Sequence, residues 1–576
     1  MIQPGGQTVA LPASTAKSLL RDLPIIVGGL SLFYGVLSLS HYWTAPVNAQ
    51  ANIQLDPSVL PKYALFSVAR ILTAYLISLV FAVAYGQFAA HNARAERVLI
   101  PLLDTLQSIP VLSFLPPVMV AMVALFPTRQ FGVELGSILL IFTGQVWNMA
   151  FSVYSSTKNI PRELVEAADV YRLSWWQRFT QLEMPCAAIG LVWNSMMSVA
   201  GGWFFLMACE AFVLGKRDLR LPGLGSYLQT ATDAGKTGAV VWGLIAMIAV
   251  IVLMDQVIWR PMIAWAEIFK FELVEASQTP RSPILTLFRR SQVLSAITRV
   301  AVDPAMEAVD LFFARRPKPS ALQVVTRSRQ WGLRALTAAG IAVVLYAVFR
   351  MSLMLAQLTG PDMAQILWGA GATFLRVEFT LVLAGLWTIP VGVYIGLRPR
   401  LSAMAQPVVQ IAASVPATAL FPIILLFLIR VGGGLGVGSI VLMLLGTQWY
   451  ILFNVIAGAS AIPTDLKEVC GIFHISSAER WKKLFLPAIF PYLVTGFVTA
   501  SGGAWNASIV AEYSKLKGHT YSTVGLGAVI SRATDAGNFA VLLGATVVMA
   551  ATVVTVNRLF WRKMYGLAST RYKLEG

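Results

Sequence analysis

The sequence predicts an all-α membrane protein with about 12 transmembrane helices, arranged as two parallel six-helix repeats. Of its 576 residues, 57% are hydrophobic and only 12% are charged, whereas about a quarter of the residues in a soluble domain are charged. Several apolar runs reach the roughly 20 residues that a helix needs to cross a bilayer, where helices satisfy their own backbone groups. The polar stretch 160–185 also recurs as 462–487, with further matching residues around it.

The charge balance and the cysteines argue against other classes. The net charge of +17 could indicate nucleic-acid binding, but basic residues in cytoplasmic loops also orient membrane proteins, so we expect no nucleic-acid partner. Cys186, Cys209 and Cys470 have neither metal-ligand spacing nor the pattern of a disulfide framework. The four histidines are scattered. We therefore expect no metal site.

The first repeat is expected over residues 1–260. Its first apolar run, 23–42, is longer than the core of about 7–15 residues in a signal peptide, so we interpret it as a retained span. The small residues at 49–51 leave a cleaved signal peptide open as the alternative. The basic segment 91–97 marks a cytoplasmic end. The expected spans are 23–42, 63–90, 99–126, 134–157, 186–213 and 239–259.

A basic linker is expected over residues 261–332. Between positions 260 and 334 there are 12 Arg and Lys against 6 Asp and Glu, which places the linker in the cytoplasm. Segments 262–277 and 291–313 have amphipathic spacing and are expected to lie along the membrane surface. The breaker Arg-Arg-Pro-Lys-Pro at 315–319 marks the boundary between the halves.

The second repeat is expected over residues 333–576. An even number of spans in each half gives both halves the same orientation, so both polar stretches and both chain termini are expected in the cytoplasm. The expected spans are 333–357, 370–396, 405–430, 435–457, 488–513 and 538–560.

Each polar stretch predicts two short helices joined by a turn. Pro161 and Pro463 suit a first helical position, where the missing N–H is no loss. A capping box is expected to open the second helix. Its partners are Ser174 with Gln177, and Ser476 with Glu479.

The two stretches resemble the EAA loop of ABC-transporter membrane subunits. The first carries Glu166-Ala167-Ala168 and ends in Pro185, and the second keeps Glu468 and Pro487. The second copy departs from the pattern at Val469 and Cys470, and both depart at its Gly, which is Arg172 in the first copy and His474 in the second. A Gly there would supply a left-handed turn residue.

The resemblance implies a type I ABC importer fold in the bacterial inner membrane. It implies that each loop docks on an ATP-hydrolysing subunit, so this fused chain would bind two copies of that ATPase, and that ATP and Mg²⁺ are bound there rather than here. It also implies alternating access and an extracytoplasmic solute-binding protein. Arg70 and Arg376, early in the second span of each half, are similar to the nitrate/sulfonate/taurine/bicarbonate branch, which implies a small anionic solute.

Ionisable residues near the outer span ends are candidates for the pathway. A charged group at the bilayer centre costs on the order of 3 kcal/mol, so Glu210 and Glu512 must be paired, face a cavity or lie near the interface. They could be gate residues, or structural partners of Lys216, Arg217, Lys515 or Lys517. Arg70 and Arg376 could bind the anion through their guanidinium forks or snorkel to the interface.

Polar and aromatic residues inside the spans are further candidates. They could line the pathway, and the alternative for the tryptophans is helix packing. They are Gln145, Trp147, Asn148 and Trp203 in the first half, and Gln448, Trp449 and Trp505 in the second.

No ATP-hydrolysing motif is expected in this chain. Gly235-Lys236-Thr237 ends like a Walker A loop, but Thr230 stands where the first Gly is required. We therefore expect no catalytic residues. The rival hypotheses are a 12-helix secondary transporter driven by an ion gradient, and a membrane scaffold that binds an ATPase without moving a solute.

Overall fold

A computed structural model describes most of the chain. The described residues are 23, 27, 53–214, 217–269, 283–291, 295–296, 298–314, 327–431, 434–516 and 519–571. Contacts divide the chain into two compact units, of which the first comprises Met1–Tyr42, Ser152–Met196 and Leu253–Val324. The second comprises Trp43–Phe151, Met197–Val252 and Val325–Gly576.

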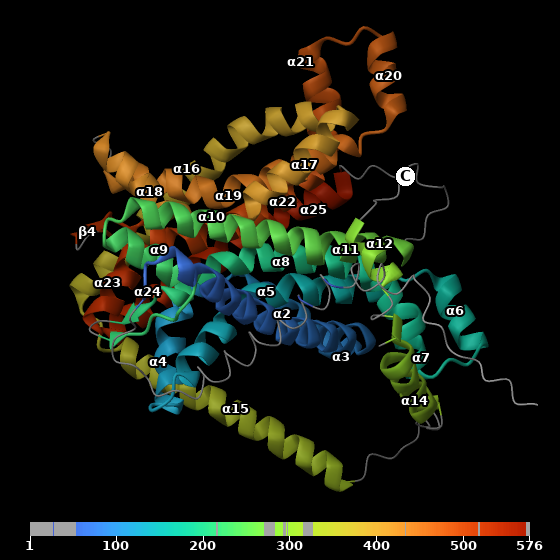
Figure 1. The fold of residues 1–576 in the computed structure, drawn as a ribbon, viewed down its shortest axis with the longest axis horizontal. Coiled ribbons are helices and arrows are strands. Elements are labelled where there is room, and N and C mark those ends of the chain that lie inside the picture. Colours follow the sequence, from blue (N-terminus) through green and yellow to red (C-terminus); the bar gives the residue numbers. More distant parts are fainter. Residues whose placement is uncertain are drawn as a thin grey trace, which may run out of the picture. The chain divides into compact units, whose positions relative to one another are not determined.

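The α-helices and strands of the first half recur in the same order in the second half (Figure 1), whereas the 3-10 turns η1, η2 and η5 have no counterpart among the described elements of the second half. The first half contains η1 (Pro57–Val59), α2 (Leu60–His91), α3 (Ala93–Ser108), η2 (Val111–Phe114), α4 (Leu115–Leu125), α5 (Phe131–Lys158), α6 (Arg162–Val170), α7 (Trp175–Arg178), η3 (Phe179–Glu183), α8 (Met184–Glu210), β1 (Val213–Leu214), β2 (Arg217–Asp218), α9 (Leu224–Asp233), α10 (Thr237–Met254), η4 (Asp255–Trp259), α11 (Arg260–Ala266) and η5 (Glu267–Phe269).

After these elements come α12 (Pro283–Arg290), η6 (Thr298–Val302), α14 (Asp303–Ala314) and α15 (Arg327–Leu355). The second half contains α16 (Gly360–Gly396), α17 (Pro399–Ser414), α18 (Ala417–Arg430), α19 (Leu435–Ser460), α20 (Thr464–Ile472), α21 (Ser477–Arg480), η7 (Trp481–Phe485), α22 (Leu486–Ala511), β3 (Tyr513–Leu516), β4 (His519–Ser522), α23 (Leu526–Ala536), α24 (Phe539–Val556), η8 (Asn557–Trp561) and α25 (Arg562–Arg571). Each strand pair is an antiparallel hairpin.

Eight helices among the described residues are long and apolar enough to span a membrane, four from each half. The chain is thus a multi-pass membrane protein, although the expected number of about 12 spans is not reached in the described part. The eight helices are Pro57–His91, Phe131–Lys158, Trp175–Glu210, Thr237–Ala266, Gly360–Gly396, Leu435–Ser460, Ser477–Ala511 and Phe539–Ala568.

The third expected span, 99–126, is formed by a bent pair of helices, which counts as a ninth span among the described residues if the pair crosses the membrane as one. Helices α3 and α4 are bent by 85° at a break between them. Pro110 causes it, because a residue before Pro is driven out of the helical region, and Ile109 is extended (φ −82°, ψ 129°). In the second half the helix likewise stops at Ser414, two residues before Pro416.

Four other expected features lie wholly or partly outside the described residues: the first span, the breaker between the halves and the two amphipathic linker segments. The first expected span, 23–42, is described only at Leu23 and Val27, and the breaker at 315–319 is not described. The expected span 333–357 falls on helix α15, of which Leu345–Leu355 is recognised as a short apolar helix. Of the two amphipathic linker segments, the second contains η6 and α14.

The second half packs around α19, which lies against both α16 and α22. Gly392 and Gly396 of α16 form a G-x-x-x-G pair, which lets membrane helices approach closely. A Cβ at Gly396 would lie 2.6 Å from the Ile456 carbonyl oxygen, and one at Gly392 would lie 2.7 Å from the Val455 side chain. Larger residues would therefore separate α16 from α19.

Candidate functional sites: two ion clusters and two projecting loops

The first ion cluster is centred on Arg70 of α2. Its Nε and Nη2 donate to the two carboxylate oxygens of Glu134, each at 2.7 Å. Its Nη1 donates to Glu210 Oε1 at 2.7 Å and to the Pro222 carbonyl oxygen at 2.8 Å. The side chains of Arg70, Glu134 and Glu210 are all 0% exposed. Four of the five N–H donors of the guanidinium thus bind protein groups.

Glu210 also caps the N-terminus of α9. Its Oε2 accepts from the Gly225 N–H at 2.7 Å, and its Oε1 accepts from the Ser67 hydroxyl at 2.7 Å. Ser67 Oγ in turn accepts from the Leu224 N–H at 3.0 Å. A carboxylate at a helix N-terminus is favourable because unpaired N–H groups point at it. A Cβ at Gly223 would collide with this carboxylate, which explains the glycine.

The second ion cluster repeats this arrangement. Arg376 Nη1 donates to Glu512 Oε1, and Thr373 donates to the same oxygen at 2.8 Å. The Gly527 N–H donates to Glu512 Oε2 at 2.8 Å, and the Leu526 N–H donates to Thr373 Oγ1 at 2.8 Å. The N-terminus of α23 is thus capped as that of α9 is.

The two clusters differ in the number of carboxylates that the arginine contacts. The residue 302 positions after Glu134 is Gly436, so Arg376 has no second carboxylate. Its Nη2 donates instead to the Val524 carbonyl oxygen at 3.1 Å and to Thr523 Oγ1 at 3.4 Å. The Arg376 side chain is 11% exposed, whereas that of Arg70 is 0% exposed.

Arg70 is buried and the Arg376 side chain is only 11% exposed, and both guanidinium groups bind carboxylates inside the protein, which contradicts the expectation that they snorkel to the interface. The expectation that both glutamates are paired is met, but by these arginines rather than by the lysines named above. Lys515 pairs with Asp535 at 2.7 Å, while Lys216, Lys517 and the Arg217 side chain lie outside the described part. Sequence reasoning missed Glu134. It could have been noticed as an acidic residue in the first turn of an apolar helix.

The polar and aromatic candidates inside the helices are mostly enclosed. Gln145, Gln448, Trp203 and Trp505 are buried. Neither amide atom of Gln145 has a hydrogen-bond partner among the described residues. The others are half-buried: Asn148 accepts from Gln107 Nε2 at 3.2 Å, Trp449 packs on the cluster of Val409, Leu452 and Ile456, and Trp147 lies on α5.

Both polar stretches form the expected pair of short helices. Ser174 caps α7 with a full capping box, since the Gln177 N–H donates to Ser174 Oγ at 3.2 Å and Gln177 Oε1 accepts from the Ser174 N–H at 2.9 Å. Ser476 caps α21, but Glu479 accepts from its hydroxyl rather than from its N–H. Helices α6 and α20 start at Arg162 and Thr464, so both prolines precede the first helical position.

The turn between the two short helices keeps its left-handed residue without a glycine. Arg172 (φ 53°) and His474 (φ 45°) are the positive-φ non-glycine residues of the described chain. The Leu173 N–H donates to the Ala168 carbonyl oxygen at 3.0 Å, and the Ile475 N–H to that of Cys470 at 3.1 Å. These bonds form the C-cap in which a left-handed residue ends a helix.

A repeated arginine, which sequence reasoning missed, ties the second short helix to the first. Arg178 Nη1 donates to Asp169 Oδ1 at 3.3 Å. Arg480, the equivalent residue, donates to the carbonyl oxygens of Ile475 at 2.7 Å and Cys470 at 3.3 Å. Each arginine thus links the second short helix to the end of the first, across the turn between them.

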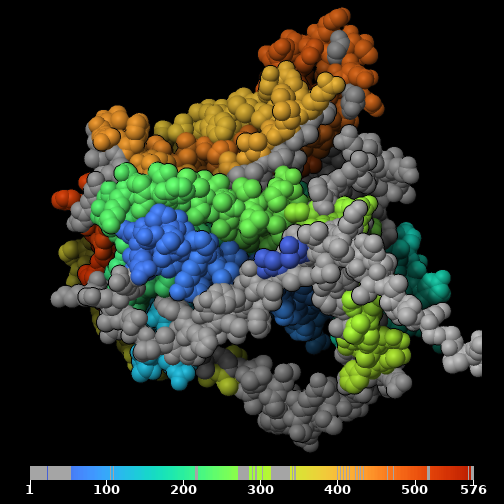
Figure 2. Space-filling model, in the orientation of Figure 1, coloured from blue at the N-terminus to red at the C-terminus, as the bar shows by residue number. Residues whose placement is uncertain are grey.

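Residues on the first short helix of each stretch are exposed. Glu166 and Glu468 are exposed and have no hydrogen bond or ion pair within the described residues, whereas Ala168 is buried and Ala167 is half-buried. Pro185 and Pro487 are the second residues of α8 and α22. Helices α20 and α21 project from the ends of the long helices (Figure 1), and Figure 2 shows their surface clear of most neighbours.

Exposed apolar side chains stand at equivalent positions in both stretches. Val170 and Tyr171 are 79% and 78% exposed, and their equivalents Ile472 and Phe473 are 72% and 73% exposed. Large apolar side chains that are exposed at matched sites are typical of surfaces that contact a partner protein or a membrane.

Residues 57–258 and 388–561 match the family of binding-protein-dependent transport system inner membrane components. These two matches cover more than half of the chain. The chain belongs to this family. It is a transport permease of duplicated design, in which the family's domain occurs twice.

Several bacterial permeases are similar to this one. The bicarbonate transport system permease protein CmpB of Synechococcus elongatus is 31% identical over 147 residues, 26% of this chain and 51% of CmpB. The nitrate import permease protein NrtB of the same organism is 30% identical over 162 residues, 28% of this chain and 54% of NrtB. The glycine betaine permease OpuAB of Bacillus subtilis is 26% identical over 191 residues, 33% of this chain and 62% of OpuAB. The aligned part thus spans about half of the first two relatives.

Wide helical turns flank the projecting loops of this permease. The π-helical turns η3 and η7 each join a short loop helix to the long helix that follows, and η4 and η8 occupy equivalent places after α10 and α24. π-helical turns are rare in proteins, and many of those that occur lie at functional sites. In the first unit, the linker helix α14 also packs against α7 of the loop.

Proposed function

We propose that this permease is the membrane-spanning subunit of an ATP-binding-cassette importer for a small anion. Two ATPase subunits bind its two projecting loops, which we call coupling loops (160–185 and 462–487). ATP with Mg²⁺ binds to those subunits and not to this chain. An extracytoplasmic solute-binding protein delivers the anion, and the pathway runs between the halves in the bacterial inner membrane, with both chain termini in the cytoplasm.

The observation that carries this proposal is the matched exposure of apolar residues on the coupling loops. The Val170–Tyr171 and Ile472–Phe473 pairs stand at the same turn of equivalent helices. Each turn is held by a left-handed residue and a tethering arginine, so the pair is presented rigidly. A rigid apolar pair can enter a groove on a partner at a low entropic cost.

The anion class is supported by the relatives' names, since CmpB and NrtB are named for bicarbonate and nitrate. OpuAB is named for glycine betaine instead, so an uptake experiment has to identify the substrate. Uptake of radiolabelled bicarbonate and nitrate by membrane vesicles, compared with glycine betaine, would decide between them.

Pull-down of the tagged permease from solubilised membranes tests the coupling. We expect an ATPase to co-purify, and the double change Ile472→Ser with Phe473→Ser to weaken its binding at least tenfold. Val431→Ser, which alters a 69% exposed apolar residue at the end of α18, is the matched control and should leave binding intact. Equal loss in both variants would contradict docking through the loop.

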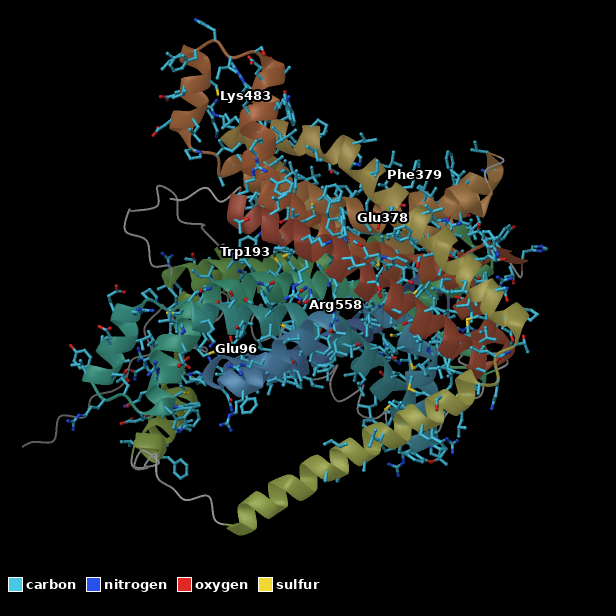
Figure 3. The ribbon with its side chains drawn as sticks, turned by 180° about the vertical axis from the view of Figure 1, so that it is seen from behind. Glu96, Trp193, Glu378, Phe379, Lys483 and Arg558 are labelled. Atoms are coloured by element: carbon cyan, nitrogen blue, oxygen red, sulfur yellow. The ribbon has the colours of Figure 1, made fainter. Side chains whose placement is uncertain are left out.

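A second candidate function is ion-coupled transport, and Glu378 of α16 favours it. Its Oε1 atom is buried without a hydrogen-bond partner among the described residues, beside the exposed Phe379 (Figure 3). An ionisable residue inside a membrane helix is by default a functional site. If uptake by vesicles ran on a proton gradient without ATP and stopped in Glu378→Gln, this candidate would replace the first.

A further inference from the structure

We propose that Arg376 binds a small planar oxyanion, such as nitrate or bicarbonate, at the place that the Glu134 carboxylate fills in the first half. The inference rests on the proposed function for the choice of anions. It starts from an internal comparison, because the two clusters share an arginine, a capped helix N-terminus and a hydroxyl partner, but not the second carboxylate.

The position of the missing carboxylate is open. Gly436 stands there, in the first turn of α19, and it is exposed. Within the part of the chain that the structure describes, a Cβ added to it would meet only Thr523 Oγ1, at 4.0 Å. In the first half the same position carries Glu134, whose side chain is 0% exposed. The point from which the Glu134 side chain extends in the first half is therefore uncrowded by described residues in the second half.

The donors of Arg376 are incompletely used. In the first half, Nε and Nη2 of Arg70 form a fork that holds both oxygens of Glu134. In the second half, Nη2 of Arg376 has the Val524 carbonyl and Thr523 hydroxyl oxygens, and Nε has no hydrogen bond to the described residues. A guanidinium fork matches two oxygens of a planar oxyanion.

The charges of the two clusters also differ by one. Arg70 faces two carboxylates, which leaves a net charge of −1 on that cluster, whereas Arg376 faces one carboxylate and forms a neutral pair. A bound monoanion would give the second cluster the charge of the first. It would also lie near the N-terminus of α19, which has neither an acidic residue in its first turn nor a side-chain cap.

The test measures anion-dependent thermal unfolding of the full permease in lipid nanodiscs, at constant ionic strength. The probes are sodium nitrate, bicarbonate and acetate, and sodium chloride is the spherical-ion reference. We expect at least one planar oxyanion to raise the Tm above that in chloride. The anion that gives the largest rise identifies the preferred ligand.

The decisive variant is Gly436→Glu, which supplies the missing carboxylate. It should raise the Tm in chloride and abolish the additional rise in the oxyanion. The matched control is Val437→Glu, which adds the same charge in the same helical turn at a 62% exposed position and should keep the rise. The site is refuted by the absence of any rise in the natural chain, by its survival in Gly436→Glu, or by its equal loss in Val437→Glu.

This assay needs neither an ATPase nor uptake, so it separates the two proposals. An oxyanion effect that depends on Gly436 supports the site even if no ATPase co-purifies. Conversely, a permease that couples to an ATPase but shows no oxyanion effect would refute the site and leave the coupling function standing.

Discussion

At the scale of single residues, Arg70 and Arg376 neutralise different numbers of buried carboxylates. Arg70 neutralises two buried carboxylates, and Arg376 neutralises one that also accepts from Thr373 and the Gly527 N–H. Removing one partner of a buried ion pair leaves an uncompensated charge, which costs about 3–5 kcal/mol. The cost should be larger when two such charges remain close together.

We therefore predict that Arg70→Met destabilises the permease more than Arg376→Met does. The loss at Arg70 should reach or exceed about 3–5 kcal/mol. Denaturant unfolding of the purified permease would measure both losses. Adding Glu134→Leu to Arg70→Met should restore part of the stability, because it removes one of the two unpaired carboxylates. Equal losses for the two arginine variants would contradict the assignment.

The left-handed residues of the coupling loops give a second prediction. A side chain in this conformation costs about 1–2 kcal/mol, which Gly avoids. Arg172→Gly and His474→Gly should each stabilise their loop by about 1 kcal/mol, measured as slower proteolysis within the loop. Tyr171→Gly is the control, since Tyr171 is right-handed (φ −75°) and should lose protection. Faster cleavage of Arg172→Gly would show that the turn is not strained.

At the scale of elements, the hairpin β3–β4 is tied to α23 by a polar contact. The Tyr513 hydroxyl donates to Asp535, and burial together with that carboxylate raises the pKa of Tyr513 to about 12. A raised pKa means that the folded form holds the proton more tightly. The stabilisation is therefore complete below the unfolded pKa of about 10 and is lost as the pH rises through about 12.

Tyr513→Phe should thus lower stability by about 1 kcal/mol at neutral pH, and the difference from the natural chain should shrink above about pH 10. Thermal unfolding at a series of pH values would measure it. Tyr521→Phe on β4 is the control, because its hydroxyl has no hydrogen bond within the described residues. A difference that stays constant up to pH 12 would argue against the Tyr513 contact.

The two coupling loops also differ as elements. Linker helix α14 packs against α7, and the second loop departs from the EAA pattern at Val469 and Cys470. We predict that Glu166→Ala and Glu468→Ala reduce uptake to different extents, since the two glutamates stand in different surroundings. Initial uptake rates at equal permease levels would test this, and equal reductions would count against unequal coupling.

At the scale of the whole molecule, the internal duplication predicts the subunit ratio of the complex. One chain carries two coupling loops, so one permease should bind two ATPase subunits. Native mass spectrometry of the purified complex would give the ratio. Two permease chains for each pair of ATPase subunits would show that each chain uses only one loop.

The sequence by itself determined the membrane class, the duplication and the pair of short helices in each polar stretch. These features depend on residues close together in the chain, such as an apolar run or the capping residue Ser174. Interactions of this local kind can be predicted from the order of the residues. A left-handed turn residue was also expected at the positions of Arg172 and His474. The sequence did not determine whether an arginine or a histidine would adopt that conformation there.

Only the tertiary structure decided how the ionisable residues are paired. Glu134, Glu210 and Arg70 are separated by 64 to 140 positions along the chain, and no local pattern relates them. Their pairing depends on how α2, α5 and α8 pack, and in low-dielectric surroundings that packing determines which charge can be buried. For the same reason, only the folded halves revealed that Gly436 leaves the donors of Arg376 incompletely used.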